Sequence, residues 1–274
     1  MPPRANTLKT RHQAKQHNGM KRIEDCKVTD YTWLNPDNFI LKLEAPEKIP
    51  VILPGNFAQI RIDNSPDVFL RRPFSVLDAD YCRNTLSFYI KIVGHGTRIL
   101  GQLKRGDVVN VIYPLGNAFT VNPGSNVLIV GGGTGIAPFI LLGRELQKNN
   151  TGMTFLIGGK SKKDVLLTGL FRPFGQVLVT TEDGSQGVKG MVTDHPVFRG
   201  EAFSFDRVYT CGPGAMMKAV AGIALQHGVA CEASLENTMG CGFGACLSCV
   251  VQTRYGNKCT CTSGPVFNAN DIIW

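Results

Sequence analysis

The stretch Cys241-Gly-Phe-Gly-Ala-Cys246-Leu-Ser-Cys249, with Cys261 further on in Cys261-Thr-Ser-Gly-Pro-Val-Phe267, is the most specific pattern in this chain. Three cysteines spaced C-x4-C-x2-C and a fourth at a distance form the thiolate pattern of a plant-type [2Fe-2S] cluster. The glycines among them allow left-handed backbone conformations, so the amides of one tight loop can turn toward the sulfur atoms. The spacing therefore predicts a small C-terminal [2Fe-2S] module, which we place at residues 233–274.

Two other interpretations of the cysteines have less support. A structural zinc site usually repeats C-x2-C on both sides, whereas this chain has an x4 gap in a glycine-dense loop. Disulfides are typical of secreted proteins, but the chain carries nine cysteines and begins without a signal-peptide pattern. We therefore expect reduced thiols and a cytoplasmic location.

The net charge of +8 is unevenly distributed over the 274 residues. Residues 1–19 are polar, lack hydrophobic periodicity and carry lysines and arginines but no acidic residue, so we expect a disordered basic tail that cofactor binding does not need. We expect no nucleic-acid partner, because no aromatic-interleaved basic patch accompanies the charge. The apolar stretches are too short to cross a bilayer, so no membrane association is expected either.

Two folding patterns precede the cysteine loop. Over residues 20–121, short alternating runs separated by Pro, Gly and Asn predict an antiparallel β-barrel, with strands in Phe39–Leu43, Phe57–Ile62, Leu86–Val93 and Val108–Ile112. Over residues 122–232, compact apolar strands alternate with helices and predict a parallel α/β sheet, with strands in Val127–Val130, Phe155–Ile157, Val177–Thr180 and Val208–Thr210. The fold class is therefore a β-barrel, an α/β domain and a cysteine module.

The barrel segment contains a candidate flavin site. Leu70-Arg-Arg-Pro-Phe-Ser75 lies at the end of a predicted strand, and an arginine and a serine beside a flavin can bond its phosphate and ring edge. Some twenty residues on, Tyr89-Ile-Lys-Ile-Val-Gly-His-Gly-Thr97 ends in a glycine turn that opens a helix. Such a turn offers free amides to a pyrophosphate. We expect His95 to face solvent.

The α/β segment contains a candidate dinucleotide site. Val127-Leu-Ile-Val is followed by Gly131-Gly-Gly-Thr-Gly-Ile-Ala-Pro138, a strand, glycine turn and helix that would bring a phosphate to a helix N-terminus. A later strand ends in Cys211-Gly-Pro-Gly214 at the edge of the sheet where ligands of such folds bind. Cys211 is either a small buried residue or a nicotinamide contact of catalytic importance.

In order and spacing, these motifs resemble the ferredoxin-NADP reductase superfamily, and the cysteine tail is similar to that of the electron transfer subunits of the heteromeric, NAD-dependent dihydroorotate dehydrogenase. The resemblance covers the chain from about Lys21 to its end. It implies that Cys241, Cys246, Cys249 and Cys261 ligate the cluster, with Cys259 a bystander. It implies an FAD site at Arg72, Pro73, Phe74, Ser75, Tyr89, Ile90, Lys91, Gly96 and Thr97. The resemblance also agrees with an NAD site at Gly131, Gly132, Gly133, Thr134, Gly135, Cys211, Gly212 and Pro213.

The resemblance also implies a function. An FMN-containing catalytic subunit would oxidise dihydroorotate in pyrimidine (UMP) biosynthesis, and this chain would pass the electrons through the cluster and FAD to NAD+. The two subunits would form a heterotetramer with two copies of each. The alternative is a reductase subunit of an NAD(P)H-ferredoxin, sulfide dehydrogenase or hydrogenase complex; some of these replace the first cluster cysteine by aspartate, so Cys241 favours the dihydroorotate system.

Apolar residues around the cysteine loop are candidates for the partner contact. We expect Phe243, Leu247 and the tail 267–274 to form an apolar docking surface through which another redox centre approaches the cluster. The alternative is that these side chains only seal the cluster from water.

We expect NADH to be preferred over NADPH. Glu182 and Asp183 follow the strand Val177–Thr180, and carboxylates accept hydrogen bonds from ribose hydroxyls but repel a 2'-phosphate. Lysines 160, 162 and 163 are a counter-signal, although loop lysines are usually solvated. The kcat/KM for NADH with an artificial acceptor should exceed that for NADPH, and equal values would contradict the prediction.

Overall fold

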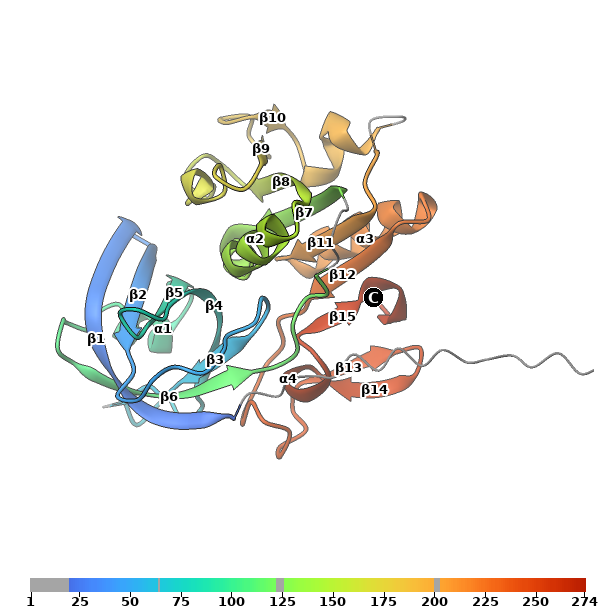
Figure 1. Ribbon diagram of the computed structural model, residues 1–274. Helices are drawn as coiled ribbons and strands as arrows, with labels where there is room; N and C mark the ends of the chain where they lie inside the picture. The colour runs from blue at the N-terminus through green and yellow to red at the C-terminus, as the bar shows by residue number, and fades with distance from the viewer. Residues whose placement is uncertain (1–19, 64, 122–125, 200–202) are drawn as a thin grey trace, which may run out of the picture.

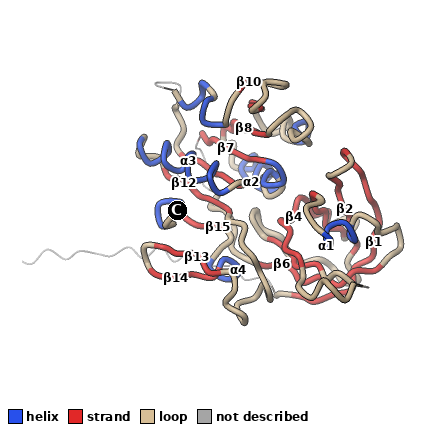
Figure 2. The backbone as a smooth tube through the Cα atoms, turned by 180° about the vertical axis from the view of Figure 1, so that it is seen from behind, coloured by secondary structure: helices blue, strands red, loops and turns tan. Residues whose placement is uncertain are grey.

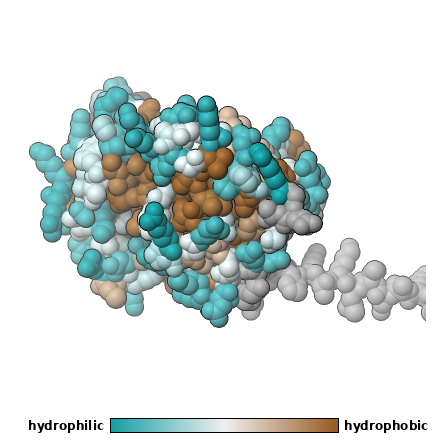
Figure 3. Space-filling model, turned by 90° about the horizontal axis from the view of Figure 1, so that it is seen from above, coloured by the Kyte–Doolittle hydropathy of each residue, from teal (hydrophilic) through white to brown (hydrophobic). Residues whose placement is uncertain are grey.

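A computed structural model describes residues 20–63, 65–121, 126–199 and 203–274 of the chain (Figure 1). The predicted tail at residues 1–19 lies outside the described residues. Within them, no helix is both long and apolar enough to span a membrane. The face seen in Figure 3 carries hydrophobic residues near its centre, surrounded by hydrophilic ones.

The first part is a closed antiparallel barrel of six strands in the order β1-β2-β5-β4-β3-β6, which confirms the predicted barrel. Alternate side chains of its strands, such as Ala58, Ile60, Phe88 and Ile90, pack in the barrel core. One short helix, α1 (His95–Leu100), follows β5. The strands are β1 (Arg22–Asn35), β2 (Asn38–Glu44), β3 (Phe57–Ile60), β4 (Arg72–Asp80), β5 (Thr85–Lys91) and β6 (Val108–Leu115).

The second part is a sheet of seven strands in the order β10-β9-β8-β7-β11-β12-β15. The pairings from β10 to β12 are parallel, as predicted, but β15 joins β12 in the antiparallel direction. The strands are β7 (Asn126–Gly132), β8 (Gly152–Gly159), β9 (Gln176–Thr181), β10 (Val188–Lys189), β11 (Arg207–Cys211), β12 (Ala230–Ser234) and β15 (Val266–Asn268).

Helices cover both faces of this sheet. Val127 and Ile129 of β7 pack with α2 (Phe139–Lys148), on the side toward the barrel, while Leu128 and Val130 pack with α3 (Gly214–Gln226) on the other side (Figure 1). This is why the central strand reads as a continuous apolar run. Single-turn 3-10 helices occupy the connections: η1 (Gly133–Ile136), η2 (Thr168–Leu170), η3 (Val192–Asp194), η4 (Pro196–Phe198) and η6 (Ala269–Asp271).

The cysteine segment is attached to both other parts. After the cysteine loop it forms a hairpin of β13 (Val250–Thr253) and β14 (Gly256–Cys259), then α4 (Thr260–Ser263), seen from behind in Figure 2. It then returns as β15 to the edge of the large sheet. The predicted boundary between residues 232 and 233 falls inside β12, so the segment starts within that sheet and returns to it as β15.

The loop after β6 is where the three parts meet. A side-chain carbon on Gly116, which has φ of +78°, would lie 2.3 Å from Pro265 Cδ and 2.8 Å from Phe57 Cε1, so only glycine fits there. The amide of Asn117 donates to the carbonyl of Gly264 at 2.6 Å. Separately, Arg144 of α2 pairs with Asp78 of β4 and ties the sheet to the barrel.

Candidate flavin, dinucleotide and cluster site

A cleft of about 560 Å³ opens between the barrel and the carboxyl edge of the large sheet. It brings together most of the predicted flavin residues and one residue of the glycine turn. The predicted residues that line it are Arg72, Pro73, Phe74, Ser75, Tyr89, Lys91, Thr97 and Thr134; the others are Phe57, Val93, Ala137, Ser234, Leu235, Glu236, Asn237, Thr238, Met239 and Pro265.

The barrel wall of the cleft is built around the start of β4. Arg72 to Ser75 are half-buried and are the first four residues of this strand. The motif therefore opens a strand, whereas the sequence predicted it at the end of one. The absence of a side chain at Gly96 leaves room for Arg72, whose Nε would lie 3.2 Å from a carbon placed on that glycine. Arg72 also donates to the carbonyl of Leu70 at 2.6 Å.

The turn before α1 is fixed by a threonine. The hydroxyl oxygen of Thr97 accepts hydrogen bonds from the amides of Val93 at 2.9 Å and Gly94 at 3.1 Å. His95 is exposed, as expected. Ile90 is fully buried in the barrel core, so its side chain does not reach the cleft; any cofactor contact would come from its backbone.

Two residues of β5 anchor the neighbouring wall. Burial raises the pKa of Tyr89 to about 12, and its hydroxyl donates to Asn38 at 3.2 Å, so it is a neutral donor at physiological pH. Lys91 lies 3.6 Å from Asp164, on the loop after β8. Arg72 and Lys91 both line the cleft, and such cationic groups fit the phosphates of a dinucleotide such as FAD.

The sheet wall joins the two predicted NAD motifs. A carbon on Gly135 would lie 2.4 Å from the carbonyl oxygen of Cys211, and one on Gly132 would lie 3.0 Å from Pro213 Cδ. The glycine turn therefore lies directly on the end of β11, at the carboxyl edge where dinucleotides bind. Of the turn, Thr134 reaches the cleft itself.

Cys211 is buried beneath the cleft. Its side chain is 1% exposed, and burial, with a smaller contribution from Glu236, raises the pKa of the thiol far above its usual range. Ser234, which lines the cleft, hydrogen-bonds to the thiol. Cys211 is therefore a neutral thiol next to the site, and its contact with a nicotinamide stays a prediction.

The floor of the cleft comes from a segment that sequence reasoning missed. Ser234 to Met239 continue from the carboxyl end of β12, the same sheet edge as the glycine turn. Although much of Glu236 is open to the cleft, the surrounding protein raises the pKa of its carboxyl. The available signal was the run Ser234-Leu-Glu-Asn-Thr at the end of a strand.

The cysteine loop turns its amides toward sulfur, as predicted. The thiol of Cys241 accepts from the backbone amides of Ala245 at 3.2 Å, Cys246 at 3.4 Å and Phe243 at 3.5 Å. Hydrogen bonds, first of all with Ser248, lower the pKa of Cys246 to about 6, so it is a thiolate at neutral pH. Gly242 and Gly244, with φ of +80° and +97°, make this loop possible.

Backbone amides also link the cysteines to one another. The amide of Cys241 donates to Cys246 Sγ at 3.4 Å, and that of Cys261 to Cys249 Sγ at 3.4 Å. In the part of the chain that the structure describes, no three His, Cys, Asp or Glu side chains converge to hold a single metal ion. Four cysteine thiolates are the usual donor set of a 2Fe-2S cluster. The four residues fit a 2Fe-2S cluster as donors, and their assignment as ligands stays a prediction.

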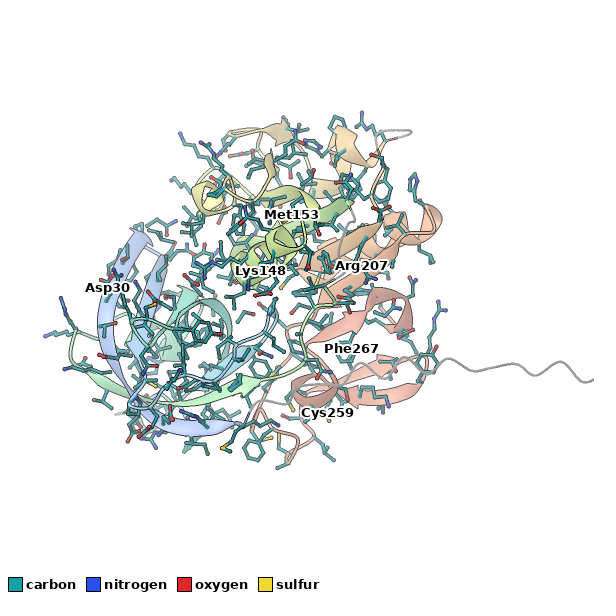
Figure 4. All side chains as sticks on the ribbon, viewed as in Figure 1. Asp30, Lys148, Met153, Arg207, Cys259 and Phe267 are labelled. Carbon is teal, nitrogen blue, oxygen red and sulfur yellow. The ribbon has the colours of Figure 1, made fainter. Side chains whose placement is uncertain are left out.

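Cys259 and Cys261 both flank Cys249. Cys261 is 1% exposed, and its thiol receives a hydrogen bond from the backbone of Gly244 in the cysteine loop. Cys259 is half-buried and packs on the cluster of side chains that contains Ile112 and Leu115 of β6 (Figure 4). The contact with the loop supports Cys261 as the fourth ligand.

The predicted docking surface is only partly exposed. Phe243 and Leu247 are 47% and 65% exposed, and Ile273 and Trp274 also reach solvent. Ala269 and Ile272, in contrast, are buried against the large sheet. Docking therefore stays a prediction for the exposed residues of this region, and sealing for the buried ones.

Comparisons with known proteins agree with this geometry. Residues 236–273 match the model of the iron-sulfur cluster binding domain of dihydroorotate dehydrogenase B, and residues 129–222 match the oxidoreductase NAD-binding domain. The chain is 37% identical to the dihydroorotate dehydrogenase B (NAD(+)) electron transfer subunit of Desulforamulus reducens, over 93% of this chain and 100% of that protein. It is 40% identical to the same subunit of Caldanaerobacter subterraneus, over 81% and 87%.

Solved structures show the same fold. An NADH-dependent reduced ferredoxin-NADP oxidoreductase, studied for flavin-based electron bifurcation, superposes with a TM-score of 0.83 at 30% identity, covering 91% of this chain and 90% of that one. The ferredoxin reductase of carbazole 1,9a-dioxygenase superposes with a TM-score of 0.66 at 22% identity, covering 76% and 67%.

Replacing the distal cysteines one at a time should separate their roles. We expect Cys261→Ser to lose most of the bound iron, because its thiol faces the loop, and Cys259→Ser to retain it. Iron and sulfide analysis of the purified proteins checks this. Iron loss in Cys259→Ser with retention in Cys261→Ser would reverse the assignment.

The Glu236 carboxyl should make stability depend on pH. Because its pKa is raised in the folded protein, its contribution is favourable below about pH 4 and is lost as the pH rises through the folded pKa. We expect Glu236→Gln to raise the Tm of the FAD-loaded protein at about pH 8 and to change it little at about pH 4. The exposed Glu47→Gln serves as the control; an equal effect in both variants would contradict the prediction.

Proposed function

Since the chain belongs to the family of dihydroorotate dehydrogenase B (NAD(+)) electron transfer subunits, we propose that it carries electrons from dihydroorotate to NAD+ through a 2Fe-2S cluster and FAD. The observation that carries the proposal is the placement of β3. On one side Phe57 reaches the cleft that holds the flavin residues, and it also packs with Cys249 and Cys261. The two cofactor regions are therefore neighbours across one strand.

The division of labour follows from the residues. FAD, when bound, would exchange two electrons at once with nicotinamide and the same two electrons one at a time with a cluster. Arg72, Ser75 and Thr97, which line the cleft, would hold and orient the flavin at the barrel wall, and the glycine turn with the end of β11 would position the nicotinamide nucleotide. Ser234 lines the approach to the flavin from the sheet, and the protonated thiol of Cys211 lies buried behind it.

The partner in this proposal is a catalytic subunit that binds FMN and oxidises dihydroorotate. Electrons from that subunit would enter this chain at the cysteine loop, where Phe243 and Leu247 are exposed. We propose a heterotetramer with two copies of each chain. We also propose a reducing, cytoplasmic location, because the four cluster cysteines must stay reduced to bind iron.

The rival function is a reductase that exchanges electrons with ferredoxin. It is favoured by the likeness, at 30% identity, to a ferredoxin-NADP oxidoreductase. That likeness extends over 91% of this chain, so the partner distinguishes the two functions.

Coexpression tests the proposal. With an FMN-containing dihydroorotate dehydrogenase subunit from the same source, we expect a stable complex that reduces NAD+ with dihydroorotate, while neither subunit does so alone. Phe243→Ser and Leu247→Ser together should weaken the complex without loss of FAD or iron, and Tyr255→Ser, at an exposed residue of the hairpin, is the control. If no complex forms and a ferredoxin accepts the electrons, the rival function holds.

A further inference from the structure

Strand β3 divides its side chains between two environments. Ala58 and Ile60 point into the core of the barrel. Phe57, on the opposite face, packs with Met239, Cys249 and Cys261 of the C-terminal segment. Because side chains alternate along a strand, Gln59 shares the face of Phe57. Gln59 therefore projects from the barrel toward the cysteine segment.

The side chain of Gln59 is fully buried and unpaired. The residue is 0% exposed, and among the described residues neither its Nε2 nor its Oε1 has a hydrogen-bond partner. A buried side-chain amide without a hydrogen-bond partner lowers the stability of the fold, and buried polar groups in proteins usually have such a partner. A buried amide such as that of Gln59 therefore indicates that a bound group supplies one. An apolar side chain of similar size would fill this place at lower cost.

The surroundings show which group the amide faces. A carbon on Gly242 would lie 2.6 Å from Gln59 Cγ and 3.0 Å from its Nε2, so the glutamine lies directly on the backbone between Cys241 and Phe243. Gly242 has φ of +80° and lacks the side chain that would separate them. The backbone of Gln59 pairs with Pro73 of the flavin wall.

We propose that Gln59 donates a hydrogen bond from its side-chain amide to a sulfide of the cluster, and thereby raises the reduction potential of the cluster relative to that of FAD. The proposal rests on the cluster assignment in the proposed function. Reduction adds negative charge to the cluster, so a donor stabilises the reduced form more than the oxidised form. Hydrogen bonds to the sulfurs are among the factors that set the potential of such clusters.

The backbone of the strand does not depend on this side chain. The carbonyl of Gln59 accepts a hydrogen bond from the side chain of Arg71 at 3.4 Å. The main chain of Gln59 is paired with Pro73 on one neighbouring strand and with Ile112 on the other. A variant with an unbranched side chain of similar length should therefore keep the barrel intact. Gln59→Met meets this requirement because it removes both polar atoms.

A redox titration followed by EPR tests the proposal. We expect Gln59→Met to lower the equilibrium constant for cluster reduction by about ten-fold, a shift of about 59 mV for one electron, with the FAD potentials unchanged. Gln252→Met, on the exposed face of β13, is the matched control and should leave both potentials unchanged. An unchanged cluster potential in Gln59→Met, or equal shifts of cluster and FAD, would overturn the proposal.

A second measurement uses the unaltered protein. After labelling glutamine side chains with ¹⁵N, pulsed EPR of the reduced cluster should detect one coupled ¹⁵N that is absent in Gln59→Met and retained in Gln252→Met. No such coupling in the unaltered chain would show that the amide serves packing or a buried water only. If the unaltered chain holds no iron, the cluster assignment itself fails; a normal cluster without the coupling overturns the role of Gln59 alone.

Discussion

The close packing of the segment around Pro265 on the loop after β6 holds the molecule together. Gly116 leaves the space into which Pro265 fits, and Asn117 binds the chain there through both its amide and its side chain, which donates to the carbonyl of Ser263 at 2.8 Å. The amide of Leu235 in turn donates to the carbonyl of Pro265 at 2.8 Å. One short segment thus contacts the barrel, the floor of the cleft and the cysteine region.

This constraint explains why the cleft and the cysteine loop lie near each other. Electron transfer needs fixed distances between redox centres, and the protein supplies them by position. The barrel contributes β3, whose one face packs in the core while the other covers the cysteines. A loose C-terminal module would not give Phe57 neighbours in both regions. The attachment of β15 to the large sheet has the same effect from the other side.

The thiols and carboxyls of the molecule divide by environment. Cys246, hydrogen-bonded and open to solvent, has a lowered pKa and is ready to bind metal, whereas burial keeps Cys211 protonated beside the cleft. Glu236 lies between these cases, accessible from the cleft but with a raised pKa. The same chain thus presents a thiolate at Cys246 of the loop and a protonated thiol at Cys211 beside the cleft.

Local sequence determined the parts, and tertiary contacts determined their relation. Spacing along the chain is enough for the cysteine loop, the glycine turn after Val130 and the alternation of the barrel strands, because each depends on neighbours within a few residues. Sequence spacing did not predict three features: the antiparallel pairing of β15 with β12, the cleft floor at Ser234 to Met239, and the side-chain amide of Gln59 that lacks a hydrogen-bond partner. In each of these, residues distant in sequence come into contact, and a single sequence carries no signal of which distant backbone will lie against a given side chain.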